Sequence, residues 1–262
     1  MHPPIADFHP GRSALLISFP HSGTHLPDEL RARLTPAALR VPDTDWHVPL
    51  LYECARELGA SLLVARHSRY VADLNRPPDG APLYPGQAET SVCPTRSFAD
   101  EPLYLPGCEP DAAEVQQRLD AYWRPYHRKL LQTVDDIRTE HGHCILWDAH
   151  SIRARVPLFF EGRLPDLNVG TADGRSCARR RSERVMQMLG AQARFSSVLD
   201  GRFKGGYITR HYGAPARGVD AIQLEIAQDA YMDEAAPAAF DAARARPLQE
   251  LLRELLAAVI KV

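Results

Sequence analysis

The sequence has few lysines and no long apolar run. Lysine occurs at only three of its 262 positions, so arginine carries almost all of the positive charge. No window approaches the roughly 18 apolar residues that a membrane-spanning helix needs. The first residues have neither the basic start nor the apolar stretch of a signal peptide. We therefore expect a cytoplasmic protein that has no membrane partner.

The charge balance and the cysteines exclude further classes of protein. Lys and Arg sum to 31 and Asp and Glu to 33, which gives a formal net charge of -2 and no basic excess for nucleic acid. The five cysteines are odd in number, widely spaced and without a CxxC pair, so we expect incidental reduced thiols. The apolar fraction of 45% and the charged fraction of 24% are typical of a globular protein.

Apolar runs of strand length alternate with amphipathic segments along the chain. This alternation predicts an α/β fold with a largely parallel sheet. The predicted strands are 14–19, 61–65, 70–74, 144–147, 167–171 and 221–226. The predicted helices are 28–39, 45–58, 111–140, 177–189 and 238–260. We expect one domain over 1–262, interrupted by a proline-rich irregular loop at about 76–110.

Polar residues lie at or near the ends of several predicted strands. His21 follows the first strand, Asn75 and Arg76 follow the third, His150 follows the fourth, and Glu225 lies inside the last. In α/β sheets, ligands bind in the crevice beyond the carboxyl ends of the strands. Two histidines with an oxygen ligand match a catalytic zinc site, and a glutamate in the same crevice could act as general base. An arginine there would hold a substrate carboxylate.

Seven motifs, in order over most of the chain, resemble those of the N-formylglutamate deformylase (N-formylglutamate amidohydrolase) family. They are SFPHSG at 18–23, PDTDWH at 42–47, DLNRPPDG at 73–80, WRPYH at 123–127, LWDAHSIR at 146–153, GRFKGGYITRHYG at 201–213 and QLEIAQDAYM at 223–232. The resemblance implies hydrolysis of N-formyl-L-glutamate to formate and L-glutamate, the last step of one route of histidine degradation.

This family is in turn similar to the zinc carboxypeptidase and aspartoacylase group. That similarity implies a three-layer α/β/α sandwich around a mixed sheet, the zinc-dependent exopeptidase (phosphorylase/hydrolase-like) fold. It also implies that His21 and His150 bind Zn²⁺ or another divalent ion. The pair Asn75 and Arg76 would bind a substrate carboxylate, and Glu225 would be the general base.

One metal ligand departs from the pattern of that group. Its His-x-x-Glu spacing would place a carboxylate at position 24, which is Thr24 here. We expect Asp45 to serve instead, with Asp43 as the alternative, because both open the next predicted helix and can face the crevice. His25 stands four residues after His21, but neighbouring prolines disfavour the helix that would align the two rings, so we interpret it as a loop histidine.

The expected substrate is a small molecule with two carboxylates, and each buried charge needs a partner. Arg76 supplies one partner. Arg210 is the candidate for the other, with Lys204 and Arg153 as reserves. Asp148 could orient His150 or could end the strand.

Two other functions fit the same residues. A related zinc N-acyl amino-acid hydrolase or carboxypeptidase would use the same groups on another substrate. A non-catalytic protein that binds an acidic amino acid would need no metal. The sequence does not determine the oligomeric state or whether the 76–110 loop is a lid.

Overall fold

One mixed sheet forms the centre of the computed structural model, which describes residues 4–262. The seven strands of this sheet lie in the order β1-β3-β2-β4-β7-β5-β6. They are β1 (Ala6–His9), β2 (Leu15–Phe19), β3 (Ser61–Ala65), β4 (Cys144–Ile152), β5 (Leu167–Gly170), β6 (Ser197–Leu199) and β7 (Val219–Ala227). The pairs β1–β3 and β5–β7 are antiparallel and the others are parallel. The predicted α/β class with a largely parallel sheet is confirmed.

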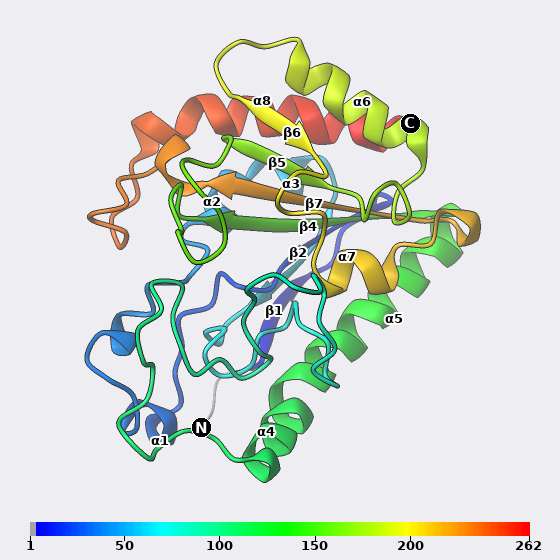
Figure 1. Ribbon diagram of the computed structural model, residues 1–262. Helices are drawn as coiled ribbons and strands as arrows, with labels where there is room; N and C mark the ends of the chain where they lie inside the picture. Colours follow the sequence, from blue (N-terminus) through cyan, green and yellow to red (C-terminus); the bar gives the residue numbers. More distant parts are fainter. Residues whose placement is uncertain (1–3) are drawn as a thin grey trace.

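Helices cover both faces of the sheet (Figure 1). One face packs against α2 (Val48–Leu51), α3 (Cys54–Glu57), α6 (Arg179–Gly190) and α8 (Ala242–Ile260). The other face packs against the π-helical turn η2 (Leu119–Trp123), α5 (Arg124–His141) and α7 (Tyr207–Tyr212), and α4 (Ala112–Arg118) leads into η2. None of the helices within 4–262 has the length and apolar character needed to cross a membrane.

The face of the sheet that packs against α5 changes from apolar to polar along three central strands. Side chains two residues apart on a strand share a face, so each strand can be followed along this face. The changes run from Leu16 to Ser18 on β2, from Leu146 to Asp148 and His150 on β4, and from Ala221 to Gln223 and Glu225 on β7. Because the three strands are parallel neighbours, their polar ends form one buried polar region at the carboxyl end of the sheet.

Two predicted helices are interrupted. The segment predicted as a helix over 28–39 contains only α1 (Asp28–Arg31) and the 3-10 turn η1 (Ala38–Arg40). The first part ends at Arg31, and Leu34 then pairs with Tyr104 in an isolated bridge. The segment 45–58 forms only α2 and α3. Asp45 therefore lies in the loop before α2 and does not open a helix, since His47 has a left-handed backbone with φ of 60°.

One further predicted element was wrong, and other elements were missed. Residues 70–74 form no strand, because their backbone bonds to loops: the N–H of Asp73 donates to Val92 O at 2.7 Å. The motif at 201–213, where no helix was predicted, contains α7. The edge strand β1 was not predicted, and its four residues are only partly buried. Residues 1–3, where the absence of a signal peptide was expected, lie outside the described residues.

The proline-rich segment forms neither helix nor strand between β3 and α4, as expected for an irregular loop. It nevertheless contacts the rest of the chain at defined points. The hydroxyl of Tyr84 donates to Gly205 O at 3.0 Å and accepts from Lys204 N at 3.1 Å. The loop thus lies against the segment that precedes α7.

The side chain of His127, on α5, contacts both the start of this loop and the helix α7. Its ring lies 3.8 Å from the Trp123 ring, centroid to centroid, and its Nε2 is 2.8 Å from Leu74 O. The hydroxyl of Tyr212 bonds to Nδ1 at 2.9 Å. Burial lowers the pKa of His127 to about 3. The neutral ring is therefore the form that this packing requires.

We predict that His127 makes the fold sensitive to acid. An unfolded histidine has a pKa near 6.5, so its neutral burial stabilises fully above that pH, and the stabilisation is lost as pH falls toward 3. Between pH 7 and pH 5 the wild type should lose about 2 kcal/mol more free energy of unfolding than His127→Gln. Urea unfolding at both pH values measures this difference, and equal losses would refute the assignment.

Candidate active site

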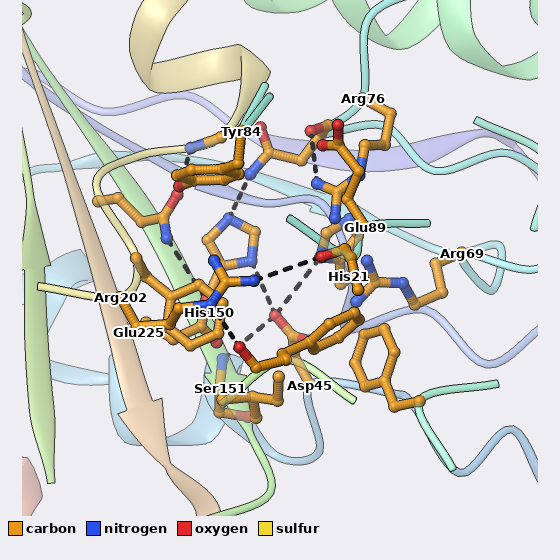
Figure 2. Close-up of a pocket in the computed structure, with 18 residues that line it drawn as sticks. His21, Asp45, Arg69, Arg76, Tyr84, Glu89, His150, Ser151, Arg202 and Glu225 are labelled. Carbon is orange, nitrogen blue, oxygen red and sulfur yellow. Dashed lines mark hydrogen bonds and ion pairs between the residues drawn. The ribbon is translucent and has the colours of Figure 1, made fainter. Parts of the chain in front are cut away.

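A pocket opens at the carboxyl ends of β2, β4 and β7. Its wall combines the polar ends of these strands with the loops that follow them. Figure 2 shows Arg76 and Tyr84 on one side of the pocket and Asp45 and Ser151 on the opposite side. The apolar side is formed by Phe98, Ile152, Phe159 and Phe203. The pocket therefore has a charged part and an apolar part.

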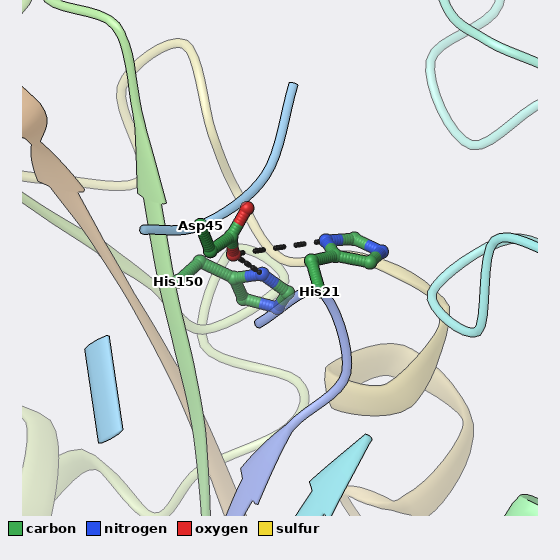
Figure 3. A group of neighbouring side chains, drawn as sticks. All are labelled: His21, Asp45 and His150. Atoms are coloured by element: carbon green, nitrogen blue, oxygen red, sulfur yellow. Dashed lines mark hydrogen bonds and ion pairs between the residues drawn. The ribbon is translucent and has the colours of Figure 1, made fainter. Parts of the chain in front are cut away.

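His21, Asp45 and His150 come together at the inner wall of this pocket (Figure 3). A carboxylate oxygen of Asp45 lies 2.9 Å from His150 Nδ1 and 3.7 Å from His21 Nδ1. Two backbone contacts fix Asp45 there: its N–H donates to His21 O at 3.1 Å, and Ser151 N–H donates to its carboxylate at 3.2 Å. The loop before α2 is thus bound to the ends of both β2 and β4.

The outer nitrogen of His21 has its own carboxylate partner. Nε2 lies 2.7 Å from Asp73 Oδ1, and the other oxygen of Asp73 accepts from Arg69 at 2.5 Å. Burial, with the nearby Arg69 cation, lowers the pKa of His21. The bond to Asp73 places the proton of the neutral ring on Nε2, so Nδ1 presents its lone pair toward Asp45.

The outer nitrogen of His150 also faces a carboxylate. Nε2 is 3.1 Å from Asp148 Oδ2, and Asp148 is fully buried. Burial alone lowers the pKa of His150, but Asp148 and Asp45 outweigh burial and raise that pKa well above its usual value. Asp148 therefore contacts the ring at Nε2, while Nδ1 on the other side of the ring faces Asp45.

These three side chains could hold a divalent metal ion. One donor atom from each lies within 4.8 Å of the others, and all three residues are buried. Zinc bonds such atoms at about 2.0–2.2 Å, so small side-chain movements bring all three onto one ion. Histidine ligands of zinc typically donate their other N–H to a carboxylate, which is the arrangement that Asp73 and Asp148 provide. The donor set is suited to zinc and to several other divalent ions.

Glu225 lies beside this group on the neighbouring strand. It is the register partner of His150 in the β4–β7 pair, so the two side chains share a face of the sheet. Burial raises the pKa of Glu225 to about 8. Gln223 Nε2 donates to its carboxylate at 3.4 Å, while Gly206 N–H donates to the Gln223 oxygen at 2.7 Å. A carboxyl group with such a pKa can accept and return a proton near neutral pH.

Two arginines line the pocket without a carboxylate partner among residues 4–262. Arg76 donates to Thr90 O at 2.9 Å. Arg202 donates to Phe159 O at 2.7 Å, and its buried Nη1 has no hydrogen-bond partner among the described residues. Burial, and then the like charge of Arg76, lowers the pKa of Arg202. Two cations that face one pocket without acidic partners form a site for anions.

The structure places the other predicted cations outside the pocket lining. Lys204 pairs with Asp173 at 2.8 Å and is partly exposed. Arg210 donates to Gly205 O at 2.7 Å and lies over the outer face of the loop residue Tyr84, with 4.9 Å from its guanidinium carbon to the ring centroid. Arg153 donates to a backbone oxygen of the segment after β7. Each of these groups has a contact elsewhere.

The alternative metal ligands also lie apart from the group. Asp43 accepts from the Tyr70 hydroxyl at 2.7 Å and from Phe98 N–H at 2.9 Å. The ring of His25 packs edge-on against His67, with 4.9 Å between centroids. Asp45 is therefore the carboxylate that meets the two histidines.

Several functional residues were missed by the sequence analysis: the pocket residues Arg69, Tyr84, Glu89, Ser151, Arg202 and Gln223, and Asp73, the partner of His21. A signal existed for two of them. Gln223 breaks the apolar alternation of its strand two residues before Glu225, and Asp73 lies in the same motif as Asn75. Arg69 and Arg202 lie in irregular segments, where no periodicity indicates which way a side chain points.

Comparisons with known proteins point to one family. A model of the N-formylglutamate amidohydrolase family matches residues 13–232. The chain is 47% identical to N-formylglutamate deformylase of Pseudomonas putida and 48% identical to that of Pseudomonas aeruginosa, each over 98% of this chain and 96% of the relative. A crystal structure of N-formylglutamate amidohydrolase from Ralstonia eutropha has a TM-score of 0.83 at 24% identity, covering 98% of this chain and 97% of that one. A gene product of Agrobacterium tumefaciens has a TM-score of 0.72 at 19% identity, covering 97% and 96%. The two solved structures show the shared fold.

We predict that Arg69 is required for stability, because Arg69→Met leaves the fully buried Asp73 carboxylate without its cation. Breaking such a buried pair costs about 3–5 kcal/mol of unfolding free energy. Arg66→Met is the matched control, because Arg66 lies three residues before Arg69 and forms an exposed ion pair with Asp7. Breaking that exposed pair should change the free energy of unfolding little. Chemical denaturation of both variants measures the effect. Similar small losses in the two would contradict the assignment.

Proposed function

We propose that the chain, which belongs to the N-formylglutamate amidohydrolase family, hydrolyses N-formyl-L-glutamate to formate and L-glutamate. One observation carries the proposal: a buried group of two histidines and an aspartate shares a pocket with Glu225 and with two arginines that have no acidic partner among residues 4–262. The curated relatives, named N-formylglutamate deformylase, match over nearly the whole chain and support the same reaction.

His21, Asp45 and His150 are the ligands of a zinc ion, or of another divalent metal, in this proposal. When bound, such an ion supplies Lewis acidity toward the formyl carbonyl and toward a water molecule. Asp73 and Asp148 hold the outer nitrogens of the two rings, so the inner nitrogens stay directed at the same point. The neutral form of His21, which burial favours, is the form that ligates.

Glu225 is the general base. It takes a proton from water on the formyl side of the pocket and delivers that proton to the departing amine. Its pKa of about 8, raised by burial, suits both transfers at neutral pH. Gln223 holds one carboxylate oxygen, and thereby restricts the directions in which the base can act.

Arg76 and Arg202 bind the two carboxylates of the substrate. Both lack acidic partners among the described residues, and both line the pocket. Without these cations, the two carboxylates of the substrate would lose their hydration and gain no partner of opposite charge. Phe98, Ile152 and Phe159 restrict the size of the acyl group, so acetyl analogues should be poor substrates.

The two alternative functions lead to different measurements. A general N-acyl amino-acid hydrolase or carboxypeptidase would act on several acyl groups or on peptides, and a binding protein would retain its ligand without turnover. Formate release from a panel of N-formyl and N-acyl amino acids separates the three functions. Zinc identity, the exopeptidase-like fold, histidine degradation and a cytoplasmic location stay predictions.

Replacing the base should abolish turnover and spare the fold. Glu225→Gln keeps the size of the side chain but cannot accept a proton, so we expect kcat for formate release to fall by at least 100-fold. Metal content, measured on the same preparation by mass spectrometry, should equal that of the wild type. Turnover close to the wild-type value would show that another group is the base.

The arginine assignment predicts a difference between two neighbouring cations. Arg202→Gln should raise KM for N-formyl-L-glutamate by about 10-fold or more, because a buried carboxylate loses its charged partner. Lys204→Gln removes a cation that pairs with Asp173, so its effect on KM should be small. Steady-state kinetics of both variants test this. A larger rise in KM for Lys204→Gln would favour Lys204, which the sequence analysis named as a reserve.

A further inference from the structure

Asn75 lines the pocket, but both polar atoms of its side chain have partners within the protein. Its oxygen accepts from the backbone N–H of Ile208, in the first turn of α7, at 2.7 Å. Its nitrogen lies 3.0 Å from Asp148 Oδ2 and 2.8 Å from His150 Nε2. A Cβ on Gly206 would stand only 2.4 Å from this nitrogen, so glycine is required for the close approach. These contacts fix the orientation of the amide, and the residue is almost fully buried.

This environment differs from that of Arg76, the next residue. Within residues 4–262, the guanidinium of Arg76 bonds only to backbone oxygens, so its charge remains available to an anion in the pocket. The amide of Asn75 is instead directed at a carboxylate of the protein itself. Asn75 and Arg76 are therefore adjacent in sequence but differ in their partners: Asn75 contacts a carboxylate of the protein, and Arg76 can contact an anion in the pocket.

Asp148 is the carboxylate on which these contacts converge. It is fully buried, and its Oδ2 receives donors from His150 at 3.1 Å, Asn75 at 3.0 Å and Thr209 at 3.3 Å. A buried carboxylate needs such donors to hold its charge and its orientation. Asn75 thus supports the group that bonds to the outer nitrogen of His150.

A short segment serves both histidines. Asp73 accepts from His21 Nε2 at 2.7 Å and from the Asn75 N–H at 2.9 Å with the same oxygen. Residues 73–75 therefore contact the outer nitrogen of each ring, one through Asp73 and the other through Asn75 and Asp148. The two ring centroids lie 4.9 Å apart, and this segment contacts both rings at their outer nitrogens.

We propose that Asn75 is a positioning residue of the metal centre, which holds His150 through Asp148, and that it does not bind the substrate carboxylate. This assignment rests on the proposed function, because it takes His150 to be a metal ligand. Carboxylate recognition by the Asn75–Arg76 pair then belongs to Arg76 alone. Partners of this kind typically change metal affinity by about 10–100-fold when they are removed.

The test measures zinc affinity and kinetics on the same variants. Zinc binding to the apoprotein is followed by competition with a chromophoric chelator, and KM and kcat by formate release. Asn75→Ser should weaken zinc binding by about 10-fold or more and lower kcat, with KM within about 2-fold of the wild type. Arg76→Gln is the matched control: it should raise KM by about 10-fold or more and leave zinc affinity within about 2-fold.

A double variant tests whether Asn75 acts through Asp148. In an Asp148→Asn background the effect of Asn75→Ser on zinc affinity should largely disappear, since the group it supports has already changed. If Asn75→Ser does not fold, Thr209→Val withdraws another donor from the same oxygen, and a weaker zinc affinity of about 3-fold is then the expected result.

Three results would overturn the proposal. One is a higher KM with unchanged zinc affinity in Asn75→Ser, which would make Asn75 a substrate ligand while the proposed function stands. The second is full additivity of Asn75→Ser and Asp148→Asn, together with unchanged zinc affinity in Thr209→Val. The third is a wild-type protein that binds no zinc or other divalent ion, which would overturn the metal assignment of the proposed function as well.

Discussion

The pairing of buried charges around Asp45 is the constraint on which the rest of the site depends. This carboxylate lies between two buried imidazoles, and each imidazole meets a second buried carboxylate at its outer nitrogen. Removing so many ionisable groups from water is unfavourable unless each has a partner. The arrangement is therefore stable only when loops distant in sequence stay docked on the sheet.

The sheet makes this docking possible. On β2, β4 and β7 the face toward α5 is apolar for the first half of each strand and polar for the second. The apolar halves bury against α5 and α7, while the polar halves stand side by side and face the loops. The segment around Asp73 supplies the remaining partners, and His127 fastens it to α5. Stability and chemistry thus share the same contacts.

Much of this could be inferred from the sequence, for reasons that particular residues illustrate. His21, His150 and Glu225 lie on or after continuous apolar strands, and the strand order places such ends together. Asp45 was inferred as a ligand because the acid expected at position 24 is absent. Its approach to both histidines depends on a loop in which His47 has a left-handed backbone. The strand predicted at 70–74 was wrong, because an apolar run can also be buried beneath loops without pairing.

The arginines show the limit of sequence patterns. Arg202 and Lys204 lie two residues apart in one motif, and neither belongs to a periodic element. Only the tertiary structure distinguishes the cation that faces the pocket from the one that pairs with Asp173. Asn75 was assigned to the substrate by analogy with an Asn-Arg pair, whereas its contacts in the fold lie with Asp148 and His150.

Anomalous diffraction at the zinc edge, from crystals of the active wild-type protein grown with zinc, tests the central claim most directly. The account predicts one strong peak within bonding distance of His21 Nδ1, a carboxylate oxygen of Asp45 and His150 Nδ1, with Asp73 and Asp148 still bonded to the outer nitrogens. Active crystals with no peak at this position, or with the metal on the outer nitrogens, would contradict it.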